Sequence, residues 1–177
     1  MIELYYDSYS VAYFIVSQDM RIRTQMELLD EIYLYDYSFL HPKYKGNKKS
    51  FISDVLYWTD YLTNKEELDK EFPVVQKDFK ASGRVFVSEK LSSDYPEFDM
   101  FYMLMRLRIL YTGNKDYIRM KLRTLLKHYG YKRRSDTIVA HMKRCMMFYH
   151  IQPYLRDYEE CDIDKIDLDD TITFRVR

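Results

Sequence analysis

Basic side chains are concentrated in one part of the chain, where they could bind a polyanion. The whole protein has 28 Lys and Arg residues and 28 Asp and Glu residues, so its formal net charge is zero. Residues 101–156, however, contain 13 basic and 2 acidic residues, whereas residues 1–100 contain 12 and 18. Such asymmetry favours a partner rich in phosphate, although a solvated face or pairing with the protein's own acidic residues would also produce it.

The densest basic run is Lys132-Arg133-Arg134, and an acidic run follows it near the C-terminus. The acidic residues of that run are Glu159, Glu160, Asp162, Asp164, Asp167, Asp169 and Asp170. They lack the central Gly and final Glu of a calcium-binding EF-hand loop, so we expect no metal there. Three roles stay open for them: binding a protein, shielding the basic residues until a partner arrives, or pairing with them in a second subunit.

The residues that usually perform catalysis show no productive spacing. His41, His128, His141 and His150 are scattered, and neither a Gly-rich phosphate loop nor a nucleophile elbow is present. Cys145 and Cys161 have no ligand spacing, which fits a reduced compartment. We therefore expect a non-enzymatic, cytoplasmic protein without a cofactor, and no contact with a membrane, because no apolar run is long enough to cross one.

The N-terminal part predicts a helical region that begins with a strand. Residues 2–16 are rich in Tyr, Val, Ile and Phe without a helical period, which is typical of a strand or a hairpin around Asp7-Ser8. Ile22, Met26, Leu29 and Tyr33 then recur at helical spacing, so we expect a helix from about Ser17 to Tyr35. A second predicted helix has one apolar stripe, formed by Phe51, Val55, Trp58 and Leu62.

Beyond that helix, Thr63 and Glu66 form a capping-box pattern that predicts a short helix ending before Pro73. Segment 73–83 is the best candidate boundary, dividing the chain into an N-terminal helical region, 1–83, and a second domain, 84–177. The many tyrosines of the first part could provide a surface for a partner or for a second copy of the chain, since Tyr offers large contact area at low entropic cost.

Residues 84–177 predict strands and three helices. Arg84–Ser88 alternates like a short strand, and a helix runs from the capping residues Ser93–Pro96 to Gly113. A second helix has Ile118, Leu122, Leu125, Leu126 and Tyr129 on its buried face and ends at Gly130. Ser135 caps a third, with Ile138, Met142, Cys145, Met146 and Tyr149 on its buried face. Residues 151–158 and 171–176 follow as strands.

The segment LLKHYGYKRRSDTIVAHMKRCMMFYHI, with the elements around it, resembles the winged helix-turn-helix superfamily. It is similar to the second and third helices of phage and plasmid replication-initiation or replisome-organiser proteins. The resemblance covers residues 84–177, about half of the chain, whereas residues 1–83 resemble no known family. It implies an α+β, mostly helical protein whose C-terminal winged helix-turn-helix follows a helical region with a short strand or hairpin.

In that superfamily the third helix enters the major groove of DNA while neighbouring residues contact phosphates. The resemblance implies that Asp136, Thr137, Ala140, His141 and Arg144 are exposed, with Arg144 reading guanine and Thr137 meeting a thymine methyl. It assigns phosphate contacts to Lys132, Arg133, Arg134 and Lys143, extended by Lys121, Arg123 and Lys127.

Together these observations predict a non-catalytic protein that binds double-stranded DNA, such as a replication or transcription factor of a phage or another mobile element. The alternative is an inhibitor or adaptor that uses the winged-helix scaffold to bind a protein through its acidic wing and tyrosine-rich surface. Its target could be a nucleic-acid-processing machine. Whether the protein forms a homodimer stays open.

Overall fold

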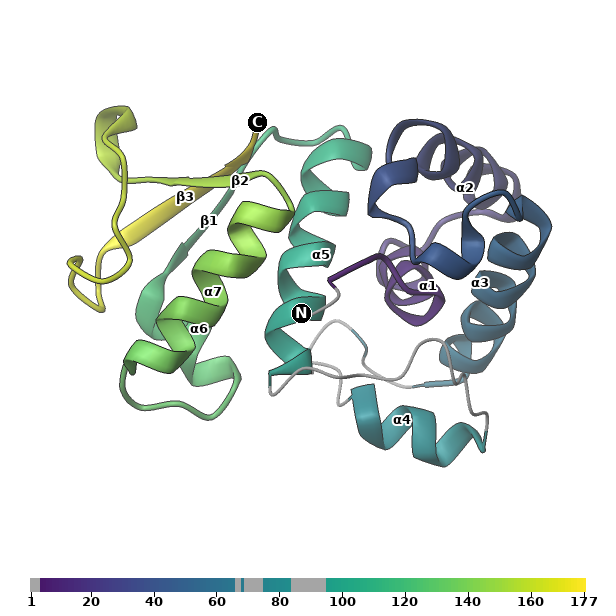
Figure 1. Cartoon of the computed structure of the whole chain (residues 1–177), viewed down its shortest axis with the longest axis horizontal. Helices are drawn as coiled ribbons and strands as arrows, with labels where there is room; N and C mark the ends of the chain where they lie inside the picture. Colours follow the sequence, from purple (N-terminus) through teal and green to yellow (C-terminus); the bar gives the residue numbers. More distant parts are fainter. Residues whose placement is uncertain (1–3, 66–67, 69–74, 84–94) are drawn as a thin grey trace. The chain divides into compact units, whose positions relative to one another are not determined.

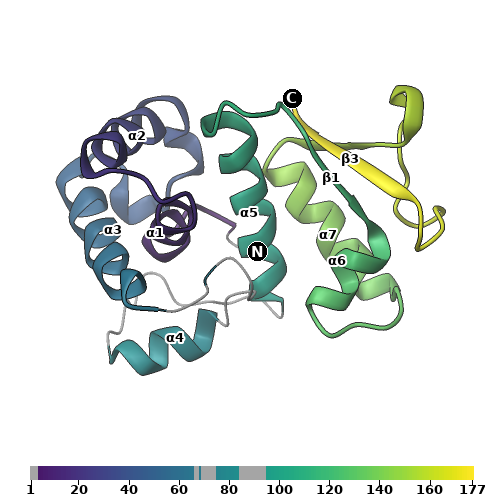
Figure 2. The ribbon, with the colours of Figure 1, turned by 180° about the vertical axis from the view of Figure 1, so that it is seen from behind.

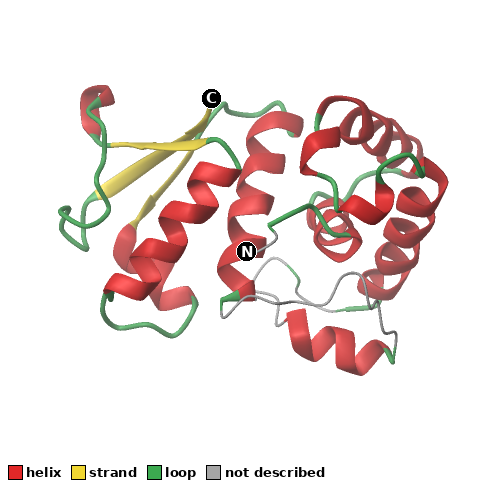
Figure 3. Ribbon diagram, viewed as in Figure 1, coloured by secondary structure: helices red, strands yellow, loops and turns green. Residues whose placement is uncertain are grey.

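The computed structural model describes residues 4–65, 68, 75–83 and 95–177, and these form a mostly helical α+β protein (Figures 1 and 3). The described residues contain seven α-helices and a three-stranded antiparallel sheet at the C-terminal end, which confirms the expected fold class at this level. The chain divides into two compact units, Met1–Met100 and Phe101–Arg177. The predicted strand at 84–88 lies outside the described residues, and the predicted boundary after residue 83 stays a prediction.

The first helix, α1 (Ser8–Ser17), occupies the segment for which we predicted a strand or hairpin, and that prediction was wrong. The Asp7 side chain caps the helix by accepting a hydrogen bond of 2.8 Å from the backbone N–H of Ser10. Every residue from Ser8 to Ile15 is buried. A helix that is apolar on all sides has no 3.6-residue period, so its Tyr, Val and Ile content resembled that of a strand.

The next two long helices were predicted, although the first begins at Ile22 and not near Ser17, which ends α1. α3 (Lys48–Thr63) buries Phe51, Val55, Trp58 and Leu62, which confirms its predicted stripe. α2 (Ile22–Tyr35) is also helical, but Ile22 is 77% exposed, so part of its predicted face was wrong. Thr63 still belongs to α3, and most of the short helix predicted after it falls on residues outside the description. Two 3₁₀ turns, Tyr37–Phe39 and Pro42–Tyr44, lie between α2 and α3.

An aromatic cluster joins α1, α3 and α4 (Val75–Ser82) inside the first unit. The Trp58 ring lies 5.2 Å from the Tyr9 ring and 5.0 Å from the Phe79 ring, measured between centroids. Asp78 accepts a hydrogen bond from the Tyr9 hydroxyl. Burial, with that bond adding to it, raises the pKa of Tyr9 far above its usual value. This tyrosine therefore belongs to the core and not to a partner surface.

The second unit contains both helices and strands, and its first helix, α5, begins before the division between the two units. The elements are α5 (Pro96–Tyr111), β1 (Ile118–Lys121), α6 (Leu122–His128), α7 (Asp136–Phe148), β2 (Ile151–Tyr154) and β3 (Thr171–Val176), with a 3₁₀ turn, η4 (Arg156–Tyr158), after β2. α5, α7 and β3 confirm the predicted elements. The helix predicted from Ile118 begins only at Leu122, because Ile118 to Lys121 pair with β3 from Phe174 to Thr171.

The sheet has the order β1-β3-β2, so the last strand is the central one, and Figure 2 shows β3 beside β1. The two faces of the sheet differ in polarity. Ile172 and Phe174 are fully buried on the inner face, where the Tyr102 ring of α5 lies 6.2 Å from that of Phe174. The outer face is polar, with Arg119 and Tyr154 on either side of Thr173 in the register. Pro153 lies opposite Phe174 in the edge strand β2.

A short turn connects α6 to α7, as predicted. Gly130 adopts a positive φ of 80°, and the N–H of Tyr131 donates to the carbonyl of Leu126 at 3.0 Å. Ser135 caps α7 by accepting from the N–H of Ile138 at 3.4 Å. The chain therefore reverses direction within a few residues, and the basic run lies in this turn.

Removing the α1 cap provides a test of the structure where the sequence misled us. We expect Asp7→Ala to lower the free energy of unfolding by about 1 kcal/mol, because the backbone N–H of Ser10 loses its acceptor. Urea unfolding at pH 7 measures this loss. Asp7→Asn retains a capping oxygen and should stay close to wild type, whereas a stable Asp7→Ala would contradict the capping role.

Candidate nucleic-acid interface

The acidic loop, residues 159–170, folds back onto the protein instead of projecting into solvent. Three of its apolar side chains are buried: Cys161 at 7% exposure, Ile163 at 1% and Ile166 at 7%. Burial of these side chains stabilises the loop by the hydrophobic effect. It also raises the pKa of the Cys161 thiol to about 11, with the charges of Asp162 and Asp170 adding to the effect.

Hydrogen bonds to backbone carbonyl groups of the acidic loop attach the loop to α6 and to the turn before α7. The Arg134 guanidinium donates from Nη1 to the carbonyl oxygens of Ile163 and Ile166 at 2.7 and 2.6 Å. The backbone N–H of Arg123 donates to the carbonyl of Leu168 at 2.8 Å. Arg134, for which the resemblance implied a phosphate contact, therefore holds the acidic loop in this conformation.

Ion pairs then neutralise two of the predicted phosphate-binding cations. Lys143 Nζ lies 2.9 Å from Asp162 Oδ1 and also contacts Asp164. Arg123 forms a bidentate pair with Asp169, with both N–O distances at 2.8 Å. These hydrogen bonds raise the pKa of Arg123 and of Lys143 and lower that of Asp169. The pairs are exposed, so water and salt screen them and each stabilises the fold only weakly.

Other predicted cations stay available to a partner. Lys127, Lys132 and Arg133 are exposed and form no ion pair with any residue that the structure describes. Since they lie within the end of α6 and the turn that follows, the fold places them in one neighbourhood. Lys121 ends β1 and is exposed, and its charge helps to lower the pKa of Asp169.

On α7, the exposed positions agree with the prediction except for one. Thr137, Ala140 and Arg144 are exposed, whereas His141 is only 1% exposed, so its predicted exposure was wrong. The physical reason is its register: His141 lies one helical turn before the fully buried Cys145 and therefore shares the core face of the helix. Its Nδ1 lies 3.3 Å from Nη2 of Arg144.

The remaining acidic residues have mixed roles. Glu160 Oε1 lies 3.7 Å from Arg177 Nη2 and forms an ion pair with it. Asp170 accepts a hydrogen bond from the backbone N–H of Asp167 at 2.9 Å. Glu159 is exposed and forms no ion pair within the described chain. The charges of the loop are thus divided between pairing inside the protein and facing solvent.

The sequence analysis missed the apolar anchors of the acidic loop, although a signal for them was present. Cys161, Ile163 and Ile166 are interspersed among charged residues, two and three positions apart, in the run CDIDKID. An exposed wing needs no apolar residue at these positions, so this pattern indicates a loop packed on one side. We interpreted this segment from its acidic charge alone and therefore did not predict that its apolar residues pack against the protein.

No protein-family model, curated protein or solved structure matches this chain in the three comparisons. Among the residues that the structure describes, no helix is both long and apolar enough to span a bilayer. Function must therefore be argued from the geometry of the site itself.

The pair between Lys143 and Asp162 gives a prediction about pH. The hydrogen bond from Lys143, with one from the backbone N–H of Asp164, lowers the pKa of Asp162 to about 2. In the unfolded chain an Asp titrates near 3.9, so the unfolded state binds this proton more readily. Ionised Asp162 therefore stabilises the fold at every pH above about 4, and this contribution is lost as the pH falls toward 2.

Accordingly, we expect the stability difference between wild type and Asp162→Asn to be constant from pH 8 to pH 5 and to shrink below pH 4. Urea unfolding at pH 7, 5 and 3 measures it. The control is Glu159→Gln, which removes an exposed carboxylate without an ion pair and should show no comparable change. A difference that already shrinks between pH 7 and 5 would rule out this assignment.

Proposed function

We propose that the second unit, with α5 as its first helix, is a winged helix-turn-helix domain that binds double-stranded DNA without catalysis. The order helix, strand, helix, helix, strand, strand supports the proposal, as does the antiparallel sheet with β3 between β1 and β2. α6 and α7, joined by a tight turn containing Gly130, have the arrangement of a helix-turn-helix. In this arrangement α7 is the helix that enters the major groove.

The observation that carries the proposal is the set of unpaired cations in front of α7. Lys127, Lys132 and Arg133 are exposed and form no ion pair among the described residues. They lie next to the N-terminal turn of a helix that exposes Thr137 and, further along, Arg144. Phosphate contacts from the turn would fix the register of α7, and its exposed side chains would then reach the base edges.

The acidic loop determines how many cations of the unit are available to neutralise DNA phosphates. Because it engages Lys143 and Arg123 through ion pairs and Arg134 through carbonyl groups, these three cations are not free to neutralise phosphates. Four cations of the predicted set would then make most of the electrostatic contact: Lys127, Lys132, Arg133 and Arg144. We expect weak binding that depends moderately on salt.

The same pairing favours the DNA proposal over the protein-binding alternative. Three acidic residues of the loop, Asp162, Asp164 and Asp169, already pair with cations of the chain, so a protein partner could use them only in competition with these pairs. At the end of α6 and in the turn before α7, by contrast, Lys127, Lys132 and Arg133 form no ion pair among the described residues, and they suit a polyanion without rearrangement.

A salt series tests the proposal directly. Fluorescence anisotropy with labelled random-sequence duplex DNA should show a plot of log K against log salt with a slope of about −3, as phosphate contacts from Lys127, Lys132 and Arg133 imply. Lys132→Ala/Arg133→Ala should weaken binding and reduce the magnitude of that slope by about 2.

Lys77→Ala/Lys80→Ala is the matched control, because it removes from α4 in the first unit two exposed lysines that form no ion pair among the described residues. This variant should bind like wild type. If wild type shows no binding at low salt, or if both double variants weaken it equally, the turn before α7 is not a DNA surface.

The effect of the acidic loop can be measured separately. We expect Asp162→Asn/Asp164→Asn to bind duplex DNA more tightly and to steepen the salt slope by about 1, because Lys143 is released to meet a phosphate. Glu31→Gln/Asp60→Asn removes two exposed carboxylates from the first unit and controls for net charge. Equal gains in the two variants would show that only overall charge matters and that the loop does not withhold Lys143.

A further inference from the structure

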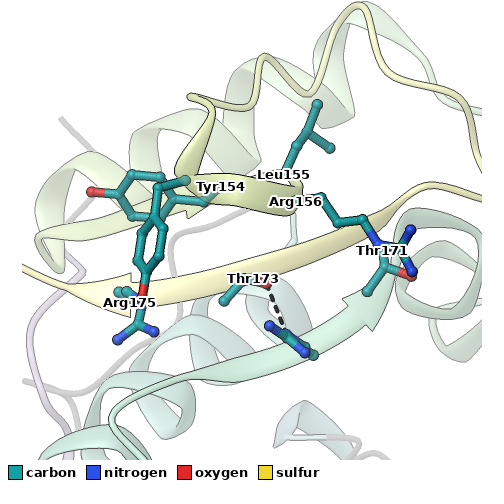
Figure 4. Close-up of a pocket in the computed structure, with 8 residues that line it drawn as sticks. Tyr154, Leu155, Arg156, Thr171, Thr173 and Arg175 are labelled. Carbon is teal, nitrogen blue, oxygen red and sulfur yellow. Dashed lines mark hydrogen bonds between the residues drawn. The ribbon is translucent and has the colours of Figure 1, made fainter.

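A pocket lies on the outer face of the sheet, between the strands and η4 (Figure 4). Its volume is about 630 Å³, which is within the range of small-molecule sites. The residues that line it come from all three strands and from the segment after β2. They are Arg119, Tyr154, Leu155, Arg156, Tyr158, Thr171, Thr173 and Arg175. None of them is acidic, and three are arginines, so the pocket suits an anion.

Two of the arginines retain donors that nothing described in the chain uses. Arg119 donates from Nε to the hydroxyl of Thr173 at 3.1 Å, which leaves its terminal nitrogens without a protein acceptor among the described residues. Arg156 is exposed and forms no ion pair within the part of the chain that the structure describes. Free guanidinium groups on a concave surface can bind phosphate oxygens in a bidentate manner.

The third arginine is held in place by its neighbours. Arg175 pairs with Asp116, and its guanidinium lies 5.2 and 5.3 Å from the ring centroids of Tyr117 and Tyr158. Its Nε is buried without a hydrogen-bond partner in the described structure. Figure 4 shows Arg175 and Arg156 toward opposite ends of the pocket, with Thr173 between them. Because Asp116 compensates the charge of Arg175, the positive charge available to a ligand comes from Arg119 and Arg156.

Tyrosine rings form the second component of the pocket. The rings of Tyr154 and Tyr158 lie 6.2 Å apart and are tilted by 68°. Tyr158 is 71% exposed and has a positive φ of 64°, a conformation that costs energy for a residue other than Gly. Folding thus places an aromatic ring in solvent at the border of a cationic pocket, where it offers a π-face to a ligand.

We propose that this pocket binds a nucleotide with an unpaired base, which stacks on Tyr158 while its phosphate contacts Arg119 and Arg156. An unpaired base can enter a concave pocket, whereas a duplex keeps its bases stacked inside the helix. Stacking on aromatic side chains beside basic groups is how proteins hold single-stranded nucleic acid.

The pocket is long enough for a whole nucleotide and not only for a phosphate group. The four-residue step from Thr171 to Arg175 spans about 13 Å of β3, longer than one phosphate group. This site shares no residue with the α6–α7 surface proposed for duplex DNA, so either proposal can fail without the other.

The test uses the full chain and single-stranded oligonucleotides. Fluorescence anisotropy with labelled oligo-dT and oligo-U, at low salt, should show binding that Arg156→Ala and Tyr158→Asn each weaken at least about fivefold. Asn adopts positive φ readily, so Tyr158→Asn removes the ring without adding backbone strain. The control is Arg133→Ala, which removes the same charge from the α6–α7 turn and should change single-strand binding less than about twofold while weakening duplex binding.

These binding results can be interpreted when circular dichroism shows that each variant has the melting temperature of the wild type. Absence of single-strand binding would overturn the inference, as would equal weakening by Arg133→Ala and Arg156→Ala, or a Tyr158→Asn variant that binds like wild type. Binding of a phosphotyrosine peptide without binding of either oligonucleotide would also overturn it. Competition by a free mononucleotide would support the inference with a single nucleotide as ligand, and binding that only an oligonucleotide competes for would support it with a strand.

Discussion

The pairing of β3 between β1 and β2 is the interaction on which the second unit depends. β3 contributes Ile172 and Phe174 to the core on one face and Thr173 and Arg175 to the pocket on the other. The period of two along a strand is what allows six residues to serve both surfaces. β2 and β3 are adjacent antiparallel strands, and the acidic loop lies in the long connection between them.

The path of this loop governs the electrostatics of the α6–α7 surface. Its buried Cys161, Ile163 and Ile166 provide attachment, and Arg134 fixes its backbone, so the carboxylates reach Lys143 and Arg123 without needing strong ion pairs. The loop and a DNA phosphate would compete for the same cations, and salt screens both interactions. The basic charge that is obvious in the sequence is therefore larger than the charge available on the folded surface.

Local patterns were predictable where a single helix face determined them. The stripe from Phe51 to Leu62, the Ser135 cap and the Gly130 turn follow from spacing and side-chain chemistry alone. Failures arose where a distant segment decided the outcome. Residues from Ile118 to Lys121 continue a helical period with Leu122, yet they form a strand because β3 pairs with them from more than fifty residues away. Burial on all sides of α1 removed the period that identifies a helix.

The candidate site shows the same division. Exposure of Lys127 could be predicted from its place on the polar face of a helix, and that of Lys132 and Arg133 from their place in a polar turn. The hydrogen bonds from Arg134 to two loop carbonyls, in contrast, depend on a contact across about thirty residues. The outer-face pocket was not predictable, since Arg119, Arg156 and Arg175 are far apart in the sequence and come together only through the pairing of β1 with β3 and the position of η4 after β2.

Pro153 has a consequence for how this sheet can meet other chains. It lies in the edge strand β2, has no N–H to offer, and its carbonyl already accepts from the N–H of Cys161 at 3.3 Å. The opposite edge, β1, carries the charged residues Arg119 and Lys121. Neither edge strand pairs readily with a strand from another chain. Edge-to-edge aggregation and binding of a partner by strand addition are therefore both disfavoured. Recognition by this unit is thereby confined to its faces and its helices.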